Sequence, residues 1–303
     1  MSGFGETISP FSTDKAGFTV RVKNEESCHR IFFVSVLPNS YLNLHVTDRQ
    51  DRHFELETTA GRLTFSGKQG WEWMSPESPG LYSLRIRTEA PADSMLLNVF
   101  VLVPLSELQG EYLNGFRIGH YPQEPLRGMS IYNPPDGFIE VTRKNRETMV
   151  SPHFRLEQFL CKQGGGYPQY LVLRERLVLK LEVILEALNT KGYTCRSFAV
   201  MSGYRTPYYN KLIGNVVYSR HVWGGAADIY IDENPQDGIM DDLNRDGIIN
   251  YRDAEVLYDI VDQMFGASWY ERFVGGLARY RKTSHHGPFV HIDVRGYRAR
   301  WGR

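Results

Sequence analysis

Cysteine is scarce in this sequence, and its spacing excludes two common ways of stabilising a fold. The 303 residues contain three cysteines, Cys28, Cys161 and Cys195, and no Cys-x-x-Cys pair. An odd, widely spaced set excludes a disulfide-rich scaffold and a zinc site built from paired thiolates. At most one disulfide can form within the chain, and the cysteine count does not decide between a reducing and an oxidising compartment.

The sequence also lacks net charge, a long apolar run and a targeting segment. Its 35 Lys and Arg residues balance 35 Asp and Glu residues, so no overall field draws the protein to nucleic acid or to an anionic membrane. No run approaches the roughly 18 apolar residues of a membrane span, and residues 1–5 lack the basic and apolar regions of a signal peptide. We therefore expect a soluble globular protein with no nucleic-acid partner and no membrane span, and the oligomeric state stays open.

The first third of the chain is rich in short apolar runs that are typical of β-strands. The length is about twice that of a usual single domain, which favours two domains. Turn residues separate the runs, which lie at 18–22, 31–37, 41–46, 81–87 and 96–103. This pattern predicts an Ig-like β-sandwich domain at residues 1–108, in which the sequence shows no chemistry.

After residue 108 the pattern loosens and then becomes helical. Residues 109–148 are rich in Gly, Pro and Tyr, and we expect an ordered linker that packs against both neighbours. In residues 149–303, apolar positions at helical spacing predict helices over 154–162, 171–189 and 254–265, with short strands between them. The predicted fold class is α+β, with an N-terminal β-sandwich followed by a mixed C-terminal domain.

Two segments of the C-terminal half carry residues suited to a catalytic metal. Residues 219–228 read Ser-Arg-His-Val-Trp-Gly-Gly-Ala-Ala-Asp, and residues 289–293 read Phe-Val-His-Ile-Asp. A tetrahedral catalytic zinc needs three protein ligands with nitrogen or oxygen donors and an open position for water. His221, Asp228 and His291 supply that set. The alternative is that these are exposed polar residues at strand ends.

The full constellation resembles the zinc D-Ala-D-Ala carboxypeptidase and murein endopeptidase family, which has the hedgehog/DD-peptidase fold. The family pattern Ser-x-His-x-x-Gly-x-Ala-x-Asp matches residues 219–228. Residues 202–206, Ser-Gly-Tyr-Arg-Thr, resemble a second family segment, and residues 290–296 are similar to its terminal strand. The resemblance covers about residues 151–303 and does not extend to the β-rich half.

The resemblance implies roles for individual residues. It implies that zinc is bound by His221, Asp228 and His291. It also implies that Arg205 anchors a substrate carboxylate or polarises the scissile carbonyl, which suits a permanently charged guanidinium. Substrate contacts are further expected from Tyr204 and Ser219, which lie in the matching segments.

The general base is not fixed by the resemblance. Several relatives carry Glu three residues before the last zinc histidine, but that position is Pro288 here, which cannot exchange a proton. His286 matches a catalytic histidine of the carboxypeptidase branch and ranks first as the residue that stabilises the oxyanion or passes a proton. Asp293 ranks second, as a base or as a partner that orients a metal ligand.

A second metal motif lies inside this domain, in a predicted insert at residues 232–254. Residues 242–253 reproduce the spacing of a calcium loop, with Gly247 at the sharp turn. The loop resembles dockerin-type and EF-hand loops, with Asp in place of Glu at its last position, and a solvated acidic loop is the alternative. The expected calcium ligands are Asp242, Asn244, Asp246, Ile248, Asn250 and Asp253.

The leading prediction is a zinc metallopeptidase that hydrolyses peptidoglycan stem peptides or crosslinks, as a carboxypeptidase or as a murein endopeptidase, with calcium in a structural role. The alternative is a metal-binding module that recognises the cell wall with weak or no turnover, because Pro288 replaces the expected Glu. A calcium-dependent adhesion protein is disfavoured, since the loop is single. We expect a periplasmic or secreted bacterial protein whose leader is absent from this sequence or whose export takes another route.

Overall fold

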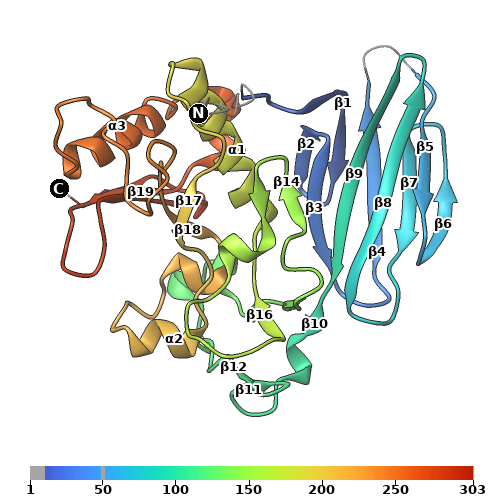
Figure 1. Ribbon diagram of the computed structural model, residues 1–303. Helices are drawn as coiled ribbons and strands as arrows, with labels where there is room; N and C mark the ends of the chain where they lie inside the picture. Colours follow the sequence, from blue (N-terminus) through green and yellow to red (C-terminus); the bar gives the residue numbers. More distant parts are fainter. Residues whose placement is uncertain (1–10, 49–51, 303) are drawn as a thin grey trace, which may run out of the picture.

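Two packed bodies make up the protein in a computed structural model, which describes residues 11–48 and 52–302 (Figure 1). The N-terminal body, called the sandwich below, contains two sheets with the strand orders β2-β1-β4-β7-β6 and β3-β9-β8-β5. Their strands are β1 Lys15–Val22, β2 Glu25–His29, β3 Ile31–Val36, β4 Tyr41–Thr47, β5 Glu55–Thr58, β6 Arg62–Ser66, β7 Gly70–Met74, β8 Gly80–Glu89 and β9 Ala92–Val101.

Alternation of side chains explains why these segments are strands. In β4, Leu42, Leu44 and Val46 are buried while the residues between them are exposed, as expected for a strand with one face on a core. All five runs predicted from the sequence form strands here. The pairing of β3 with β9 is parallel, whereas a simple antiparallel meander would have no such pair.

The segment between the two bodies is ordered. It contains β10 (Val103–Pro104), β11 (Tyr112–Leu113), β12 (Phe116–Arg117) and β13 (Gly137–Val141), with short 3-10 turns at Leu105–Glu107, Leu126–Gly128 and Ser130–Tyr132. Strand β13 pairs with β10 on one side and with β16 (Gln169–Leu171) on the other. The segment is therefore joined to the C-terminal body by the backbone hydrogen bonds between β13 and β16.

The C-terminal body is built on a five-stranded sheet with the order β17-β18-β20-β19-β21. Its strands are β17 Ala199–Ser202, β18 Ala226–Tyr230, β19 Gly276–Tyr280, β20 Phe289–Asp293 and β21 Ala299–Trp301. The helices are α1 Glu175–Thr190, α2 Pro207–Leu212 and α3 Tyr251–Asp262, with 3-10 turns η5 Arg220–Trp223 and η6 Ser268–Phe273. Helix α3 packs against β19 and β20. The described residues thus combine strands and helices in the manner of an α+β protein.

Two of the three predicted helices are confirmed with shifted ends, and one prediction was wrong. Helix α1 starts four residues late because Leu171 belongs to β16, and α3 starts three residues early behind the cap Asn250. The predicted helix at residues 154–162 is absent. This segment instead contains β15 (Phe154–Arg155), which pairs with β14 (Met149–Ser151), and a four-residue 3-10 turn, η4, at Leu156–Phe159. The backbone is extended at Arg155 and again at Leu160, so no continuous helix spans this segment.

Helix α1 joins the two bodies. It contacts β2, β3 and β14 as well as α3, and its first turn forms ion pairs to the sandwich, Glu175 with Lys23 at 2.9 Å and Arg176 with Glu25 at 2.8 Å. One hydrophobic cluster runs through both bodies, from Phe33 of the sandwich through α1 to the C-terminal sheet. This shared core holds the bodies in a fixed arrangement.

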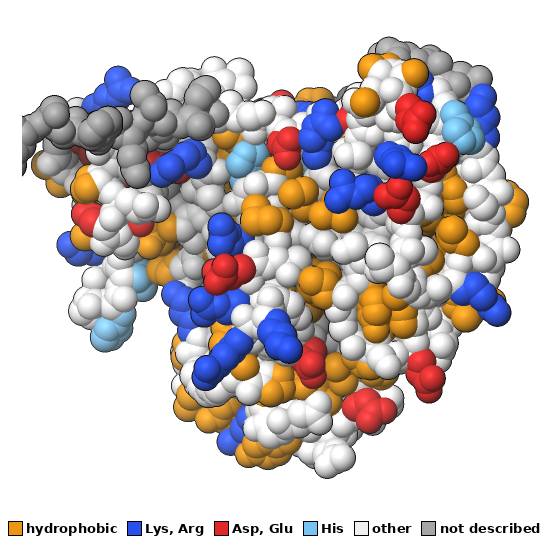
Figure 2. Space-filling model, turned by 45° about the vertical axis from the view of Figure 1, so that its right-hand side comes forward, with side chains coloured by type: hydrophobic (Ala, Val, Ile, Leu, Met, Phe, Trp, Pro, Cys, Tyr) orange, Lys and Arg blue, Asp and Glu red, His pale blue; other side chains and the backbone are white. Residues whose placement is uncertain are grey.

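The surface agrees with the balanced composition. On the face drawn in Figure 2, basic and acidic side chains are interspersed with scattered hydrophobic ones. Within the described part of the chain no helix is long and apolar enough to cross a membrane. All three cysteines are free thiols.

Candidate metal centre

A row of paired positions across the C-terminal sheet carries the predicted metal ligands. Residues that face each other on adjacent strands point to the same side of a sheet. Asp228 on β18 pairs with His291 on β20, so both side chains rise from one face. The row comprises Ser202, Asp228, His291, Ala278 and Trp301.

His221 reaches this row from the 3-10 turn η5, which directly precedes β18. The turn ends at Gly224, whose φ of +63° and close approach to the backbone of Val172 leave no room for a Cβ. Only glycine fits such a turn. The chain can therefore enter β18 at once, which brings His221 and Asp228 together despite their short separation in sequence.

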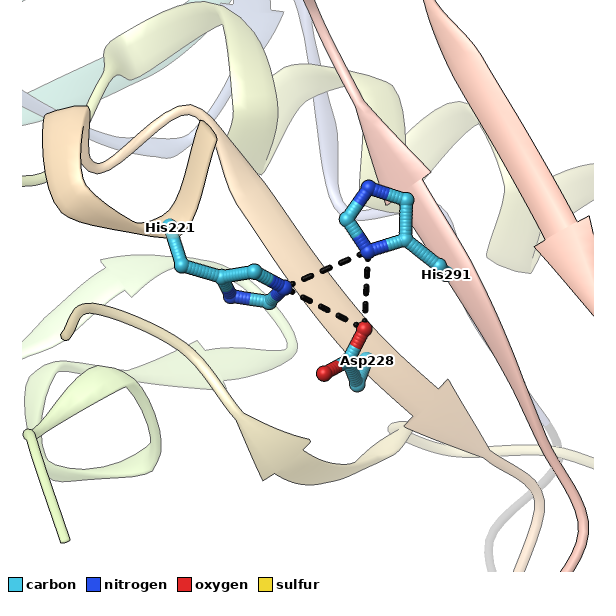
Figure 3. A group of neighbouring side chains, drawn as sticks. All are labelled: His221, Asp228 and His291. Carbon is cyan, nitrogen blue, oxygen red and sulfur yellow. Dashed lines mark hydrogen bonds and ion pairs between the residues drawn. The ribbon is translucent and has the colours of Figure 1, made fainter. Parts of the chain in front are cut away.

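The three predicted ligands converge on one point (Figure 3). Nε2 of His221 lies 3.2 Å from Nδ1 of His291 and 3.2 Å from Oδ1 of Asp228, and the last two atoms are 2.8 Å apart. All three residues are buried. Among the described residues this is the one group of three or more His, Cys, Asp and Glu side chains whose donor atoms lie within 4.8 Å of one another.

The outer hydrogen bonds of both imidazoles leave the inner nitrogens free for a metal. Nδ1 of His221 lies 2.7 Å from the carbonyl oxygen of Gly203, which can only accept, so this nitrogen carries the proton. Nε2 of His291 faces Oδ2 of Asp293 at 3.2 Å, also an acceptor. The convergent atoms Nε2 of His221 and Nδ1 of His291 then present lone pairs. This donor set fits a zinc ion, whose histidine ligands are commonly held in this way.

Electrostatics in the centre favour a bound cation. Burial would raise the pKa of Asp228, but His221 and His291 outweigh it and hold that pKa far below its ordinary value. Burial lowers the pKa of His221. Burial also acts to lower the pKa of His291, but the hydrogen bonds that its ring donates to Asp228 and Asp293 raise this pKa overall. The carboxylate is therefore ionised at neutral pH and ready to ligate a cation.

Asp293 is fully buried behind His291 and is surrounded by donors. Arg295 donates to both of its carboxylate oxygens, and the amide of Gly276 donates to Oδ1 at 2.7 Å. Burial would raise its pKa, but His291 and Arg295 hold the pKa well below the ordinary range. A carboxylate held in this way orients His291, and it has little tendency to accept a proton.

Arg205 borders the metal centre, and Tyr204 lies in the core. Nη2 of Arg205 donates to Oδ2 of Asp228 at 2.6 Å, and its Nε donates to Ser202 at 2.8 Å. Tyr204 is 2% exposed, and its hydroxyl is paired with that of Tyr121 at 3.0 Å. The guanidinium thus lies beside the predicted metal ligand Asp228, whereas Tyr204 is buried with its hydroxyl paired inside the core.

Ser219 and His286 lie at the margin of the centre. Ser219 precedes η5 and is partly exposed, and its hydroxyl forms no hydrogen bond with the described residues. His286 lies in the β19–β20 connection, with its ring 5.0 Å from that of Phe289 and Nδ1 2.8 Å from the carbonyl oxygen of Gly287. It has no hydrogen bond to a metal ligand in the described structure.

Two aromatic residues near the centre were missed by sequence reasoning. The Trp301 ring lies 5.1 Å from that of His291, and its Nε1 donates to the hydroxyl of Tyr280 at 2.7 Å. Tyr280 lies two positions from Ala278 on β19, so it shares the face of the metal row. No spacing signal marked either residue, because β21 joins the sheet only through the tertiary fold.

The predicted calcium loop is closed by its own backbone amides. Asp242 accepts from the amides of Asp246 and Gly247, and Asn244 and Asp246 accept from amides further along the loop. Asp253 is fully buried, and its two oxygens accept from the amides of residues 243, 244 and 250. The carbonyl of Ile248 accepts from the side-chain amide of Asn250. The six predicted ligands therefore lie in one compact loop, but they do not form a group of donor atoms as close as that of His221, Asp228 and His291 within the described residues.

Comparison with known proteins supports the zinc assignment. Residues 136–250, less than half of the chain, match the family model of Peptidase M15. The matched stretch contains His221 and Asp228, and His291 lies beyond it. A comparison with curated proteins gave no match. The family match supports a metal-dependent peptidase, and the convergent His/Asp/His cluster supports the metal.

Proposed function

We propose that this protein is a zinc peptidase that hydrolyses peptide bonds in peptidoglycan, either trimming a stem peptide or cutting a crosslink. The observation that carries the proposal is the convergence of Nε2 of His221, Nδ1 of His291 and Oδ1 of Asp228 on one point. The match of residues 136–250 to Peptidase M15 supports the reaction class. The choice of peptidoglycan rests on the resemblance of residues 202–206 and 219–228 to wall-cleaving relatives.

His221, Asp228 and His291 would hold the zinc ion, with Gly203 and Asp293 fixing the two imidazoles from outside. When bound, zinc supplies Lewis-acid polarisation of a carbonyl and makes a water molecule more acidic. The protein's own residues would orient the zinc ligands, bind the substrate and offset the negative charge that develops on the carbonyl oxygen.

Arg205 is proposed to bind the carbonyl or carboxylate of the substrate. Ser202 accepts from its Nε and Asp228 from its Nη2, and within the described residues the other guanidinium hydrogens form no hydrogen bond and can meet an acidic group. A preorganised donor costs no rearrangement at the moment when charge develops on the carbonyl oxygen. Ser219, whose hydroxyl has no partner among the described residues, is proposed as a further substrate contact.

Tyr280 is proposed to help stabilise the oxyanion. Its oxygen accepts the hydrogen bond of Trp301, so its own hydrogen points elsewhere, and no acceptor takes it within the described residues. Tyr280 lies two positions from Ala278 on β19, on the face of the metal row, and burial raises its pKa so that the proton is kept. A neutral hydroxyl can donate to a developing negative charge.

His286 is proposed as the residue that passes the proton. Its Nε2 has no partner in the described structure, and Phe289 fixes the ring at the edge of the metal-bearing face. Asp293 is assigned to orientation of His291, because its two oxygens are occupied by Arg295 and Gly276.

A second candidate is a wall-recognition module with weak turnover. It is favoured by Pro288, which stands where several relatives carry a carboxylate base. An assay with purified peptidoglycan distinguishes the peptidase from the recognition module. Release of D-Ala or of crosslinked fragments that stops with chelator and returns with zinc supports the peptidase, whereas metal-independent binding without release supports the module.

Calcium binding at residues 242–253 is proposed as a structural feature of the same body. The support is the match of all expected ligand positions and the turn at Gly247, whose φ is +80°. The loop leads directly into α3, which packs on β19 and β20. A bound ion would therefore brace the sheet that carries His291. A periplasmic or secreted location follows from the proposed substrate.

A further inference from the structure

A cavity lies between the two bodies, away from the metal centre. Its volume is about 330 Å³. The β1–β2 turn of the sandwich, the 3-10 turn after Met129, the start of α1 and Arg220 of η5 surround it. The lining residues used below are Lys23, Glu25, Arg174, Glu175, Arg176 and Arg220.

Arg220 is the least satisfied charged side chain of this cavity. It is 3% exposed, and its Nε has no hydrogen-bond partner within the described structure. Its Nη1 donates to the carbonyl oxygen of Ile131 at 2.7 Å, and the Tyr132 ring covers the guanidinium at 4.8 Å. No carboxylate forms an ion pair with it among the described residues. A buried guanidinium with no anion in hydrogen-bond contact is costly.

Arg174 brings a second unpaired guanidinium to the same wall. Its Nε donates to the carbonyl oxygen of Trp223 at 3.2 Å, and its two terminal amino groups form no hydrogen bond with the described residues. Arg174 and Arg295 act on Arg220 as like charges, which the charge of Asp293, held by Arg295, offsets only from a distance without an ion pair to Arg220. Arg174 and Arg220 therefore repel each other in the absence of an anion between them.

The two carboxylates of the cavity are already neutralised. Glu175 pairs with Lys23 at 2.9 Å and accepts from the amide of Ser35 at 3.0 Å. Glu25 pairs with Arg176 at 2.8 Å and with Arg272 at 3.1 Å. Neither carboxylate forms an ion pair with Arg174 or Arg220 in the described structure, so the lining carries an excess of positive charge.

We propose that this cavity is an anion-binding site in which Arg174 and Arg220 hold a phosphate or carboxylate group. Paired guanidinium groups match the oxygen geometry of both groups, and burial strengthens each charge-assisted hydrogen bond. The ligand would satisfy the orphan Nε of Arg220 and remove the repulsion between the arginines. Because both bodies line the cavity, a polymer that carries such groups would be held where the sandwich meets the metal-binding body.

Isothermal titration of the full-length, zinc-loaded protein with inorganic phosphate and, separately, with glutarate tests the site. The wild type is expected to bind at least one of them, and R174Q to weaken that binding tenfold or more, about 1.4 kcal/mol. R155Q removes an exposed arginine outside the cavity and is expected to leave binding unchanged. Phosphate that binds at zinc is insensitive to R174Q, so the variant isolates the cavity.

The two probes show which chemical group the site prefers. Preference for phosphate points to a phosphodiester polymer, and preference for glutarate points to a peptide carboxylate. R220K keeps the charge but loses the planar fork, and it should weaken binding as R174Q does. Equal binding by wild type and R174Q, or no binding of either probe at millimolar concentration, would overturn the proposal. Neither outcome bears on peptide hydrolysis, which is measured separately.

Discussion

Asp293 lies behind His291, with its Oδ2 3.2 Å from Nε2, on the side of the imidazole opposite to Asp228. This arrangement fixes which nitrogen of His291 carries a proton and which one faces the other two predicted metal ligands. The position of Asp293 is itself fixed by Arg295 and by the amide of Gly276. The orientation of a metal ligand thus depends on a chain of contacts that runs away from the centre.

D293N is expected to weaken zinc binding by about 10- to 100-fold, because the amide can donate where a carboxylate only accepts, and it no longer fixes the His291 tautomer. Competition with a chromophoric chelator measures the affinity. The control D262N alters an acid that pairs with Arg298 and Arg300 at the surface of α3. Unchanged zinc affinity in D293N would show that Asp293 does not orient the ligand.

Y280F is expected to lower kcat by about tenfold or more with little change in KM, because the hydroxyl would act mainly on the developing oxyanion. Steady-state hydrolysis of a defined muropeptide measures both constants, and zinc content serves as the check on the centre. Y82F is a matched control, since that hydroxyl bonds the carbonyl of Ser78 on the sandwich. Equal kcat in wild type and Y280F would remove Tyr280 from the mechanism.

The burial of Lys180 leads us to expect that the free energy of unfolding depends on pH. It is fully buried on α1, where it donates to the carbonyl oxygen of Asp293 at 2.8 Å, and burial lowers its pKa to about 7. The unfolded chain keeps the ordinary, higher lysine pKa and so binds more protons than the folded chain between pH 7 and 10. The free energy of unfolding should therefore rise with pH in that window through this residue.

Denaturant unfolding of wild type and K180M at pH 7 and pH 9 measures this contribution. The wild type should gain stability relative to K180M on going to pH 9, by at most about 1.4 kcal/mol per pH unit. Other titrating groups cancel in the difference. If the two proteins change in parallel, the lysine is charged in the folded state at both pH values.

Calcium is expected to raise the melting temperature of the full chain, and a calcium-selective chelator to reverse the rise, because an ion that binds only the folded loop stabilises it by mass action. D246N removes one ligand charge at an exposed position of the loop and should reduce the shift. A melting temperature that changes neither with calcium nor with the chelator would contradict the calcium assignment.

The proximity of His221 and Asp228 could be predicted from the sequence because it is set locally. The spacing of His221 and Asp228 is set by one turn and one strand, and Gly224 marks that turn. Helix α1 was equally visible, since its apolar face repeats over sixteen residues. Strong periodicity and rigid short-range geometry are the features that a single sequence retains.

Other parts of the centre depend on contacts between distant segments. Trp301 joins the row only because β21 runs parallel to β19, and Lys180 reaches Asp293 only because α1 packs below the sheet. Neither has a spacing rule that could reveal it. The exposed strand β6 was missed for a different reason: every residue of it is exposed, so no apolar alternation marks it.

The most direct test of the central claim compares wild type and H221A in two readouts, zinc content and hydrolysis of defined muropeptides. The wild type is expected to retain about one zinc ion per chain and to release D-Ala or cleaved crosslinks, with activity lost to chelator and restored by zinc. H221A should retain neither zinc nor activity while its β-sandwich stays folded. Hydrolysis by H221A at the wild-type rate would contradict the account.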